Sequence, residues 1–317
     1  MDRHSHVTPP RPASPVARLA RLTLLAALLV TAFVTPARAA LRVVTTTPDL
    51  AALTKAVAGP RASVVALALP SQDPHFVDAR PHLALDLAKA DLLIVVGADL
   101  EVGWLPTLLT GARNGRIQSG AAGYLDASTL IGLLDAPSGK VDRSQGDVHP
   151  HGSPHFLLDP RRAERIAIGI GKKLAELDPA GHASYLAATK AFVTDLRARR
   201  ASWEARLAGL RGKPIVAYHR SLSYLADWLA LDVIEHLEPR PGIPPTPGHV
   251  ARVIEQAQAR KVRLLLQEAW YPMTTSQLAA QKMGAKLVVL PGSADFAAGQ
   301  SYAGFLESIV KKLESAS

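Results

Sequence analysis

DLLIVVG, at residues 91–97, is the stretch that decides the fold, because five consecutive apolar residues lie between an aspartate and a glycine. An uninterrupted apolar run of this length is typical of a strand buried on both faces of a parallel sheet. Strand and helix patterns that alternate along the chain predict a parallel α/β fold. Further strand patterns lie at residues 41–46, 64–69, 213–218, 233–237, 262–267 and 286–290.

The first 39 residues predict an export signal that is removed, rather than a part of the fold. A basic front precedes an apolar stretch at 22–34, and Ala-Arg-Ala at 37–39 supplies the small-x-small cleavage pattern. The apolar stretch is shorter than the ~20 residues that a membrane span needs. The chain has no cysteine, so we expect no lipid anchor, no disulfide and no thiolate ligand. Together these features predict a protein of the periplasm.

The remaining residues divide into two lobes and a connector. Residues 40–177 predict an N-terminal α/β lobe with an exposed, histidine-containing loop near 136–154. Residues 178–211 carry apolar side chains at alternating steps of three and four, which predicts one amphipathic helix of about 30 residues, or about 45 Å. Residues 212–317 predict a C-terminal α/β lobe. The expected fold is therefore two Rossmann-like lobes with parallel sheets, joined by one long backbone helix.

The charge of the chain does not indicate a nucleic-acid partner. Beyond residue 39 the chain has 31 basic and 26 acidic side chains, a net charge of +5. The densest basic run, at 197–200, lies on the expected long helix without interleaved aromatic residues. Nucleic-acid binding would require a basic stripe with stacking side chains, so we expect none.

Three histidines far apart in the sequence suggest a metal site. His75, His155 and His219 each follow a strand or loop pattern rather than lying within a helix. Ligands of open parallel sheets gather beyond the carboxyl ends of the strands, where His75, His219 and the region of Glu268 are expected. Neutral imidazoles suit Zn²⁺ and can fill most of a tetrahedral shell.

These histidines lie in short motifs that follow a familiar order. DPH at 73–75, PHFLLDP at 154–160 and AYHRS at 217–221 carry them, and GADLEVGWL at 97–105 and GIPPTP at 242–247 accompany them. Together with the export signal and the long helix, they resemble the zinc- and manganese-binding subgroup of ABC-transporter substrate-binding proteins, of the zinc-uptake type. Two departures are visible: the stretch GADLEVGWL at 97–105 has one extra residue, and Leu157 stands where the family has tryptophan. The resemblance covers essentially the whole chain after residue 39.

The resemblance implies a role and a ligand arrangement. Such proteins capture a metal in the cleft between the lobes and deliver it to a membrane permease with its cytoplasmic ATPase, and a periplasmic metal chaperone is a further candidate partner. The first two ligands, here His75 and His155, come from the N-terminal lobe, and the third, here His219, comes from the other lobe. We expect a monomer.

The fourth ligand has three candidates. Glu268 follows the apolar strand pattern at 262–267, so its carboxylate is expected at the cleft edge, and we favour it. Asp295 is the alternative, because many relatives supply an aspartate near the C-terminus. Water or an open position is the third possibility.

Three histidines and one carboxylate favour Zn²⁺ over Mn²⁺, which prefers harder oxygen donors. His149 and His151, in the loop near 136–154, are candidates for a weak auxiliary site, because zinc members of the resembled family often carry a histidine-rich loop there. The alternative interpretation is an exposed linker with incidental histidines.

Three alternative functions remain on the sequence alone. A manganese-specific member of the same family differs only in its metal. An exported zinc-dependent hydrolase would also use three histidines and an open position, but the chain has no His-Glu-x-x-His segment. A binding protein for an organic ligand such as a siderophore would share the two lobes and the long helix, but would not need the three histidines.

Overall fold

The computed structural model describes residues 40–139 and 146–316. The expected export signal, residues 1–39, lies outside the described residues. Within the described ranges, no helix has the length and apolar character that crossing a membrane requires.

The N-terminal sheet is formed by four parallel strands in the order β2-β1-β3-β4. The apolar run within residues 91–97 supplies β3, which is buried along its whole length. The last strand was not predicted, because its three residues are only partly buried and contain no apolar run. The strands are β1 (Leu41–Thr45), β2 (Ala62–Ala66), β3 (Leu92–Val95) and β4 (Tyr124–Asp126).

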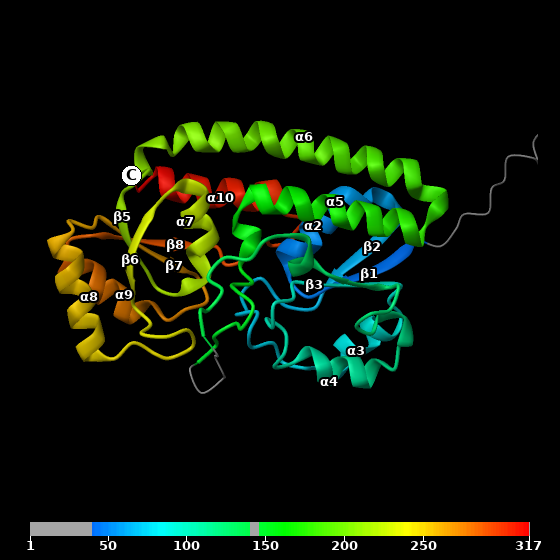
Figure 1. Cartoon of the computed structure of the whole chain (residues 1–317), viewed down its shortest axis with the longest axis horizontal. Helices are drawn as coiled ribbons and strands as arrows, with labels where there is room; N and C mark the ends of the chain where they lie inside the picture. Colours follow the sequence, from blue (N-terminus) through cyan, green and yellow to red (C-terminus); the bar gives the residue numbers. More distant parts are fainter. Residues whose placement is uncertain (1–39, 140–145, 317) are drawn as a thin grey trace, which may run out of the picture. The chain divides into compact units, whose positions relative to one another are not determined.

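The C-terminal sheet repeats this topology with four parallel strands in the order β6-β5-β7-β8. The predicted parallel α/β fold with two lobes is thereby confirmed, and both lobes are visible on either side of Figure 1. The strands are β5 (Pro214–Ala217), β6 (Asp232–His236), β7 (Leu264–Glu268) and β8 (Lys286–Leu290).

The helices begin at residues that favour helix initiation. Proline is the first residue of α2, α3, α5 and α8, where its missing N–H costs nothing. Side-chain oxygens of Asp159, Thr246 and Ser301 accept backbone N–H groups at the starts of α5, α8 and α10. The helices are α2 (Pro48–Ala58), α3 (Pro81–Ala88), α4 (Leu105–Ala112), α5 (Pro160–Leu177), α6 (His182–Arg206), α7 (Ser223–Leu229), α8 (Pro247–Ala259), α9 (Met273–Met283) and α10 (Tyr302–Glu314).

The long connecting helix is shorter than the sequence predicts. The helix α6 has 25 residues instead of about 30, because 3₁₀ turns at Pro179–Gly181 and Ala208–Leu210 form its flanks. It still extends over both lobes (Figure 1). It packs closely on α5, where a Cβ atom added at Gly171 would lie 2.1 Å from the Thr189 hydroxyl oxygen. A glycine is therefore required at this helix crossing.

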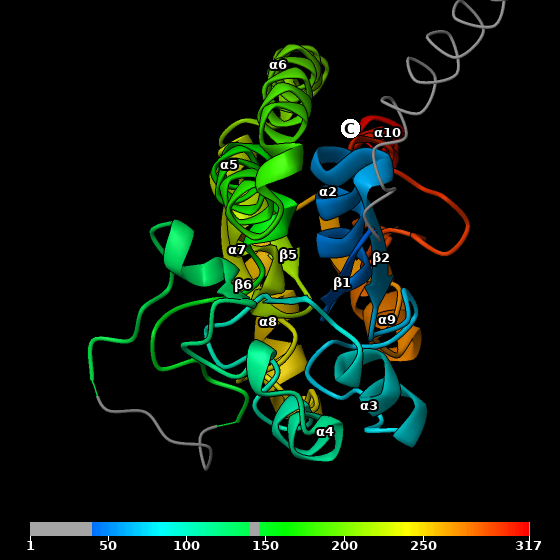
Figure 2. The same ribbon diagram turned by 90° about the vertical axis from the view of Figure 1, so that its right-hand side faces the viewer.

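One hydrophobic core joins the two lobes. Buried side chains from both sheets and from α2, α5, α6, α7 and α10 belong to a single cluster. In Figure 2, α2, α5, α6 and α10 lie together in the upper part of the view, whereas α3 and α4 lie at the bottom. Two smaller cores serve one lobe each. Because apolar burial is continuous between the lobes, wide separation of the lobes would expose core surface and be costly.

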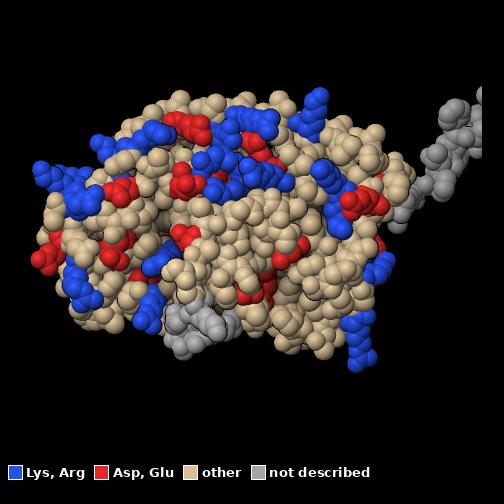
Figure 3. Space-filling view, in the orientation of Figure 1, with Lys and Arg blue, Asp and Glu red and all other residues tan. Residues whose placement is uncertain are grey.

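The basic run on α6 is a surface of ion pairs. Arg197 and Arg200 both bind Glu164 of α5, and Arg199 binds Asp195 one turn earlier. Figure 3 shows basic and acidic side chains interspersed on this face. The run therefore contributes to helix packing and gives no separate basic stripe on the face in view.

Candidate metal centre

The chain places the predicted ligands at loops between the lobes. His75 lies in the loop after β2, His155 precedes the 3₁₀ turn that leads into α5, and His219 follows β5 by two residues. Glu268 is the last residue of β7. Because parallel strands end at a common edge, these loops converge from both lobes.

The three imidazole rings form a compact triangle. The ring centroids of His75 and His155 are 5.1 Å apart, those of His155 and His219 are 5.8 Å apart, and those of His75 and His219 are 5.9 Å apart. His75 and His219 are buried, and His155 is partly buried. A nitrogen of His75 and one of His155 lie within 4.8 Å of each other and of a nitrogen of His149, and this group of described residues does not include His219.

Two buried acceptors in this region have no hydrogen-bond partner among the described residues. They are Nε2 of His155 and Oε2 of Glu268, whose residues line one cavity of about 50 Å³ together with Thr47 and Trp270, which each have an unpaired buried polar atom as well. Buried polar atoms are nearly always paired, so two unpaired acceptors need an explanation. An imidazole nitrogen and a carboxylate oxygen are both ligands that Zn²⁺ takes, so the chemistry of these two atoms fits a metal ion.

Two carboxylates orient the imidazoles. Nδ1 of His75 is 2.6 Å from Oδ1 of Asp73, and Nδ1 of His219 is 2.6 Å from Oε2 of Glu238. A carboxylate at Nδ1 favours the tautomer with the proton there, which leaves the Nε2 lone pair for a metal. Neither role was predicted from the sequence. Asp73 had a signal in the Asp-Pro-His motif, whereas Glu238, two residues after β6, had none.

The loop that carries His75 is fastened to its own lobe. The backbone N–H of His75 donates to Oδ1 of Asp73 at 3.0 Å, and the Trp104 indole N–H donates to the carbonyl of Pro74 at 3.0 Å. Trp104 is buried in the core beneath α3 and α4. The Gly-Trp-Leu part of the GADLEVGWL motif thus supports the first histidine.

Burial and neighbouring charges shift the pKa values of three of the predicted ligands. Burial and the neighbouring histidines lower the pKa of His155 well below its ordinary value, so its ring is neutral near pH 7. Burial alone would lower the pKa of His219, but the Glu238 carboxylate outweighs it and raises that pKa. Burial raises the pKa of Glu268 to about 7, although Ser221 and His219 oppose the shift.

The two candidates for the fourth ligand differ in their surroundings. Glu268 is buried beside the cavity that His155 also lines, and the Ser221 hydroxyl donates to its Oε1. Asp295 is exposed and accepts the backbone N–H of Ala298 at 3.2 Å within its own turn. The assignment of a fourth ligand stays a prediction, and the surroundings favour Glu268.

The two loop histidines lie in different places. Nε2 of His149 is 3.1 Å from Nε2 of His75, and His75, His149 and His155 can each offer a nitrogen within 4.8 Å of the others. His151 is exposed and lines another cavity beside β3 and β4. The loop is tied to the C-terminal lobe, since the N–H of Asp147 donates to the Pro241 carbonyl at 2.8 Å. His149 therefore lies against the three-histidine triangle, closer than a separate auxiliary site would require.

Comparisons with known proteins identify relatives of this chain. Residues 43–316 match the model of the family "ZnuA: Zinc-uptake complex component A periplasmic". The high-affinity zinc uptake system protein ZnuA of Paracoccus denitrificans is 27% identical over 230 residues, which cover 62% of this chain and 67% of the relative. The manganese ABC transporter substrate-binding lipoprotein scaA of Streptococcus gordonii is 28% identical over 161 residues, 50% of this chain and 48% of the relative.

A solved structure supports the same fold. The substrate-binding protein FpvC from Pseudomonas aeruginosa, solved in complex with Mn²⁺, superimposes with a TM-score of 0.72 at 23% sequence identity. The match covers 87% of this chain and 99% of that structure.

The family match decides between a carrier and an enzyme. Members of the matched family are periplasmic substrate-binding components of transporters, so the prediction that the chain is not an enzyme is confirmed and the hydrolase alternative is dropped. Relatives named for zinc and for manganese both occur, and relatives are described as periplasmic proteins or as lipoproteins. The chain belongs to the zinc-uptake complex component A family of metal-binding substrate-binding proteins of ABC transporters.

Proposed function

We propose that the protein captures Zn²⁺ in the periplasm and delivers it to an ABC-transporter permease, with His75, His155, His219 and Glu268 as ligands. The observation that carries this proposal is the cluster of three imidazoles together with two unpaired buried atoms, Nε2 of His155 within the cluster and Oε2 of Glu268. The metal is the cargo, so the residues have to bind and release it without chemical change. Titration of the purified protein with Zn²⁺ tests the proposal, with one ion bound per chain as the expected result.

The donor set supports zinc over manganese. Imidazole nitrogens suit Zn²⁺, whereas Mn²⁺ prefers oxygen donors, and here at most one carboxylate joins three imidazoles. Manganese remains the second candidate because a relative is named for it. Parallel titrations with Zn²⁺ and Mn²⁺ decide between them: tighter Zn²⁺ binding is expected, and equal affinities would reject the zinc proposal.

The supporting carboxylates have a defined task in capture. Asp73 and Glu238 hold the Nδ1 protons of His75 and His219, which aims both Nε2 atoms at the site. His155 is already neutral near pH 7, because burial and the adjacent histidines lower its pKa. His75 and His219 are therefore oriented by a carboxylate partner, whereas His155 is kept neutral by its surroundings.

The Glu238→Gln variant should shift the pH dependence of binding. The raised pKa of His219 means that a proton competes with the metal for this ring, and binding weakens as the pH falls through that pKa. Without the Glu238 charge, the pKa of His219 falls and the loss of binding moves to lower pH. At high pH the variant binds about tenfold more weakly, because the ring loses its orienting partner.

This shift is measured by Zn²⁺ competition with a chelator between about pH 5 and 8, the range in which imidazoles titrate. A Glu235→Gln variant, changed on β6 three residues before Glu238 and outside this hydrogen bond, serves as the control. An unchanged pH midpoint in the Glu238→Gln protein would show that Glu238 does not govern His219.

The His149→Ala variant should retain one bound Zn²⁺ per chain. His149 lies against His75, so its removal is expected to change the rate of metal capture and to weaken binding less than loss of a triangle histidine does. Deleting residues 142–152 should likewise leave the stoichiometry at one. Titration calorimetry and stopped-flow capture of Zn²⁺ measure both effects, and loss of all binding in either variant would mean that the loop forms the main site.

The periplasmic location is part of the proposal. It is supported by the description of the matched family as a periplasmic component. Fractionation of cells that express the full chain should place it with periplasmic proteins, and recovery in the cytosolic fraction would reject the placement.

A further inference from the structure

The segment that carries His155 is held by side chains of the C-terminal lobe, although it leads into α5, a helix of the N-terminal lobe. The Tyr224 hydroxyl, on α7, donates to the carbonyl of Ser153 at 2.8 Å and accepts the N–H of Leu134 at 2.9 Å. Tyr224 is buried, so water does not readily replace these bonds. They fix the backbone two residues before His155.

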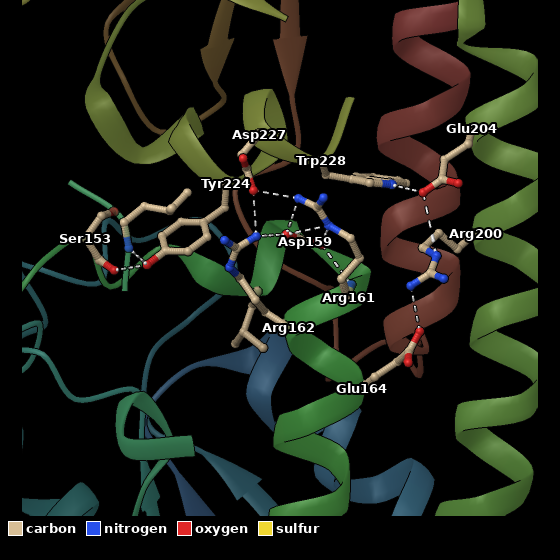
Figure 4. A network of polar contacts seen from close by, with 12 residues as sticks. Ser153, Asp159, Arg161, Arg162, Glu164, Arg200, Glu204, Tyr224, Asp227 and Trp228 are labelled. Carbon is tan, nitrogen blue, oxygen red and sulfur yellow. Dashed lines mark hydrogen bonds and ion pairs between the residues drawn. The ribbon is translucent and has the colours of Figure 1, made fainter. Parts of the chain in front are cut away.

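A second attachment lies four residues after His155. The buried carboxylate of Asp159 binds Arg161 and Arg162, and both guanidinium groups also reach Oδ2 of Asp227 on α7, at 2.6 and 2.8 Å. Figure 4 shows the two arginines between Asp159 and Asp227, with the Tyr224 ring beside Arg162. Two positive and two negative charges thereby fasten the start of α5 to the other lobe. Networks of this kind stabilise more than isolated surface pairs.

Packing joins the two attachments. The Arg162 guanidinium lies over the Tyr224 ring, 4.8 Å from its centroid, and the Phe156 ring meets the same tyrosine edge-on at 6.2 Å. From α10, the Tyr302 hydroxyl donates to the carbonyl of Leu157 at 2.8 Å. The segment is therefore held by the C-terminal lobe on both sides of His155.

The same part of the C-terminal lobe carries His219. Only the 3₁₀ turn Arg220–Leu222 separates His219 from α7, which holds Tyr224 and Asp227. The position of His155 relative to His219 is thus set through α7, and neither Tyr224 nor Asp227 is one of the proposed ligands.

We propose that Tyr224 and Asp227 are positioning residues that fix His155 against His219 across the two lobes. This inference rests on the proposed function, since it concerns two of the proposed ligands. Binding constellations must be held within about 0.5 Å of the working geometry, and supporting partners of metal ligands commonly change affinity about 10–100-fold. The attachments act one step further from the metal, so an effect near the lower bound, about tenfold, is expected.

The test uses Tyr224→Phe, which removes one hydroxyl and keeps the ring, and Asp227→Asn, which removes one charge from a half-exposed side chain. The matched controls are Tyr185→Phe, which removes a buried hydroxyl bonded to Asp178 at 3.0 Å, and Asp195→Asn, which removes an exposed ion pair with Arg199. Zn²⁺ affinity, the Zn²⁺ dissociation rate and the visible absorption spectrum of bound Co²⁺ are measured for each protein.

The expected result is about tenfold faster Zn²⁺ dissociation and an altered Co²⁺ spectrum in both α7 variants, with neither change in the controls. The spectrum reports ligand geometry, which a purely structural loss of stability would not alter. Wild-type affinity, rate and spectrum in Tyr224→Phe and Asp227→Asn would overturn the inference, as would equal effects in the controls. If the wild-type chain binds neither ion, the proposed function fails instead, so the two failures are distinguishable.

Discussion

The His219→Ala variant should bind Zn²⁺ at least about 100-fold more weakly than the wild-type protein. Structural zinc sites are worth about 10–16 kcal/mol, so loss of one of four ligands removes about 3 kcal/mol, or roughly two orders of magnitude in affinity. His219 is also the proposed ligand that follows β5 of the C-terminal sheet, so its loss weakens the bridge between the lobes. Competition with a chelator of known affinity measures the change.

The control for this experiment is His182→Ala, in which an exposed histidine at the start of α6 is removed. It should bind Zn²⁺ as the wild-type protein does. If the two variants bound equally well, His219 would not be a ligand and the triangle would have to be read as a packed histidine cluster.

The Glu268→Gln variant should bind metal more weakly than the wild-type protein. In the absence of metal it should be more stable than the wild type. Loss of a charged ligand weakens Zn²⁺ binding by about 100-fold on the same reckoning. The pKa of Glu268 is raised to about 7 by burial, so ionisation destabilises the folded, metal-free protein. This penalty grows from about pH 4.5, where the unfolded chain loses its proton, to about pH 7, and is fully present above that.

We therefore expect the metal-free Glu268→Gln protein to have a higher Tm than the wild type at pH 8, and a smaller difference at pH 5. Asp295→Asn is the comparison, and it should change neither the Zn²⁺ affinity nor the Tm, because that side chain is exposed in its own turn. Weak binding by Asp295→Asn together with wild-type binding by Glu268→Gln would assign the fourth position to Asp295.

The parallel α/β fold was predictable because its signals are local. The apolar run in β3 and the helix-starting prolines act within a few residues, and the motif order placed three histidines at loops near strand ends. The strand β4 escaped because it is short and half-buried. The length of the connecting helix was overestimated. The sequence pattern continues into the flanking residues, but these residues form 3₁₀ turns instead of α-helix.

The surroundings of the candidate site were less predictable, because they depend on contacts between distant segments. Glu238 meets His219 only after β6 has paired with β5, and no periodic pattern marks it. His149 reaches His75 because its loop is tied to Pro241 in the other lobe. The attachments of Tyr224 and Asp227 are of the same kind. Sequence patterns identify ligand types, whereas tertiary contacts decide how the ligands are held.

The structure also limits how the lobes can move. They share one hydrophobic core, a 25-residue helix extends over both, and the α5–α7 ion pairs fasten them beside the site. A wide hinge opening would disturb the shared core, the long helix and the ion pairs. Release of the metal is therefore expected to use a modest local movement around the site.

The most direct test of the proposed zinc site is a crystal structure of the Zn²⁺-loaded protein with anomalous data at the zinc absorption edge. We predict one strong peak per chain, about 2.0–2.1 Å from a ring nitrogen of His75, His155 and His219, with the Glu268 carboxylate as the fourth ligand. A peak bound by His149 and His151 alone, or one that His155 and His219 do not contact, would contradict it.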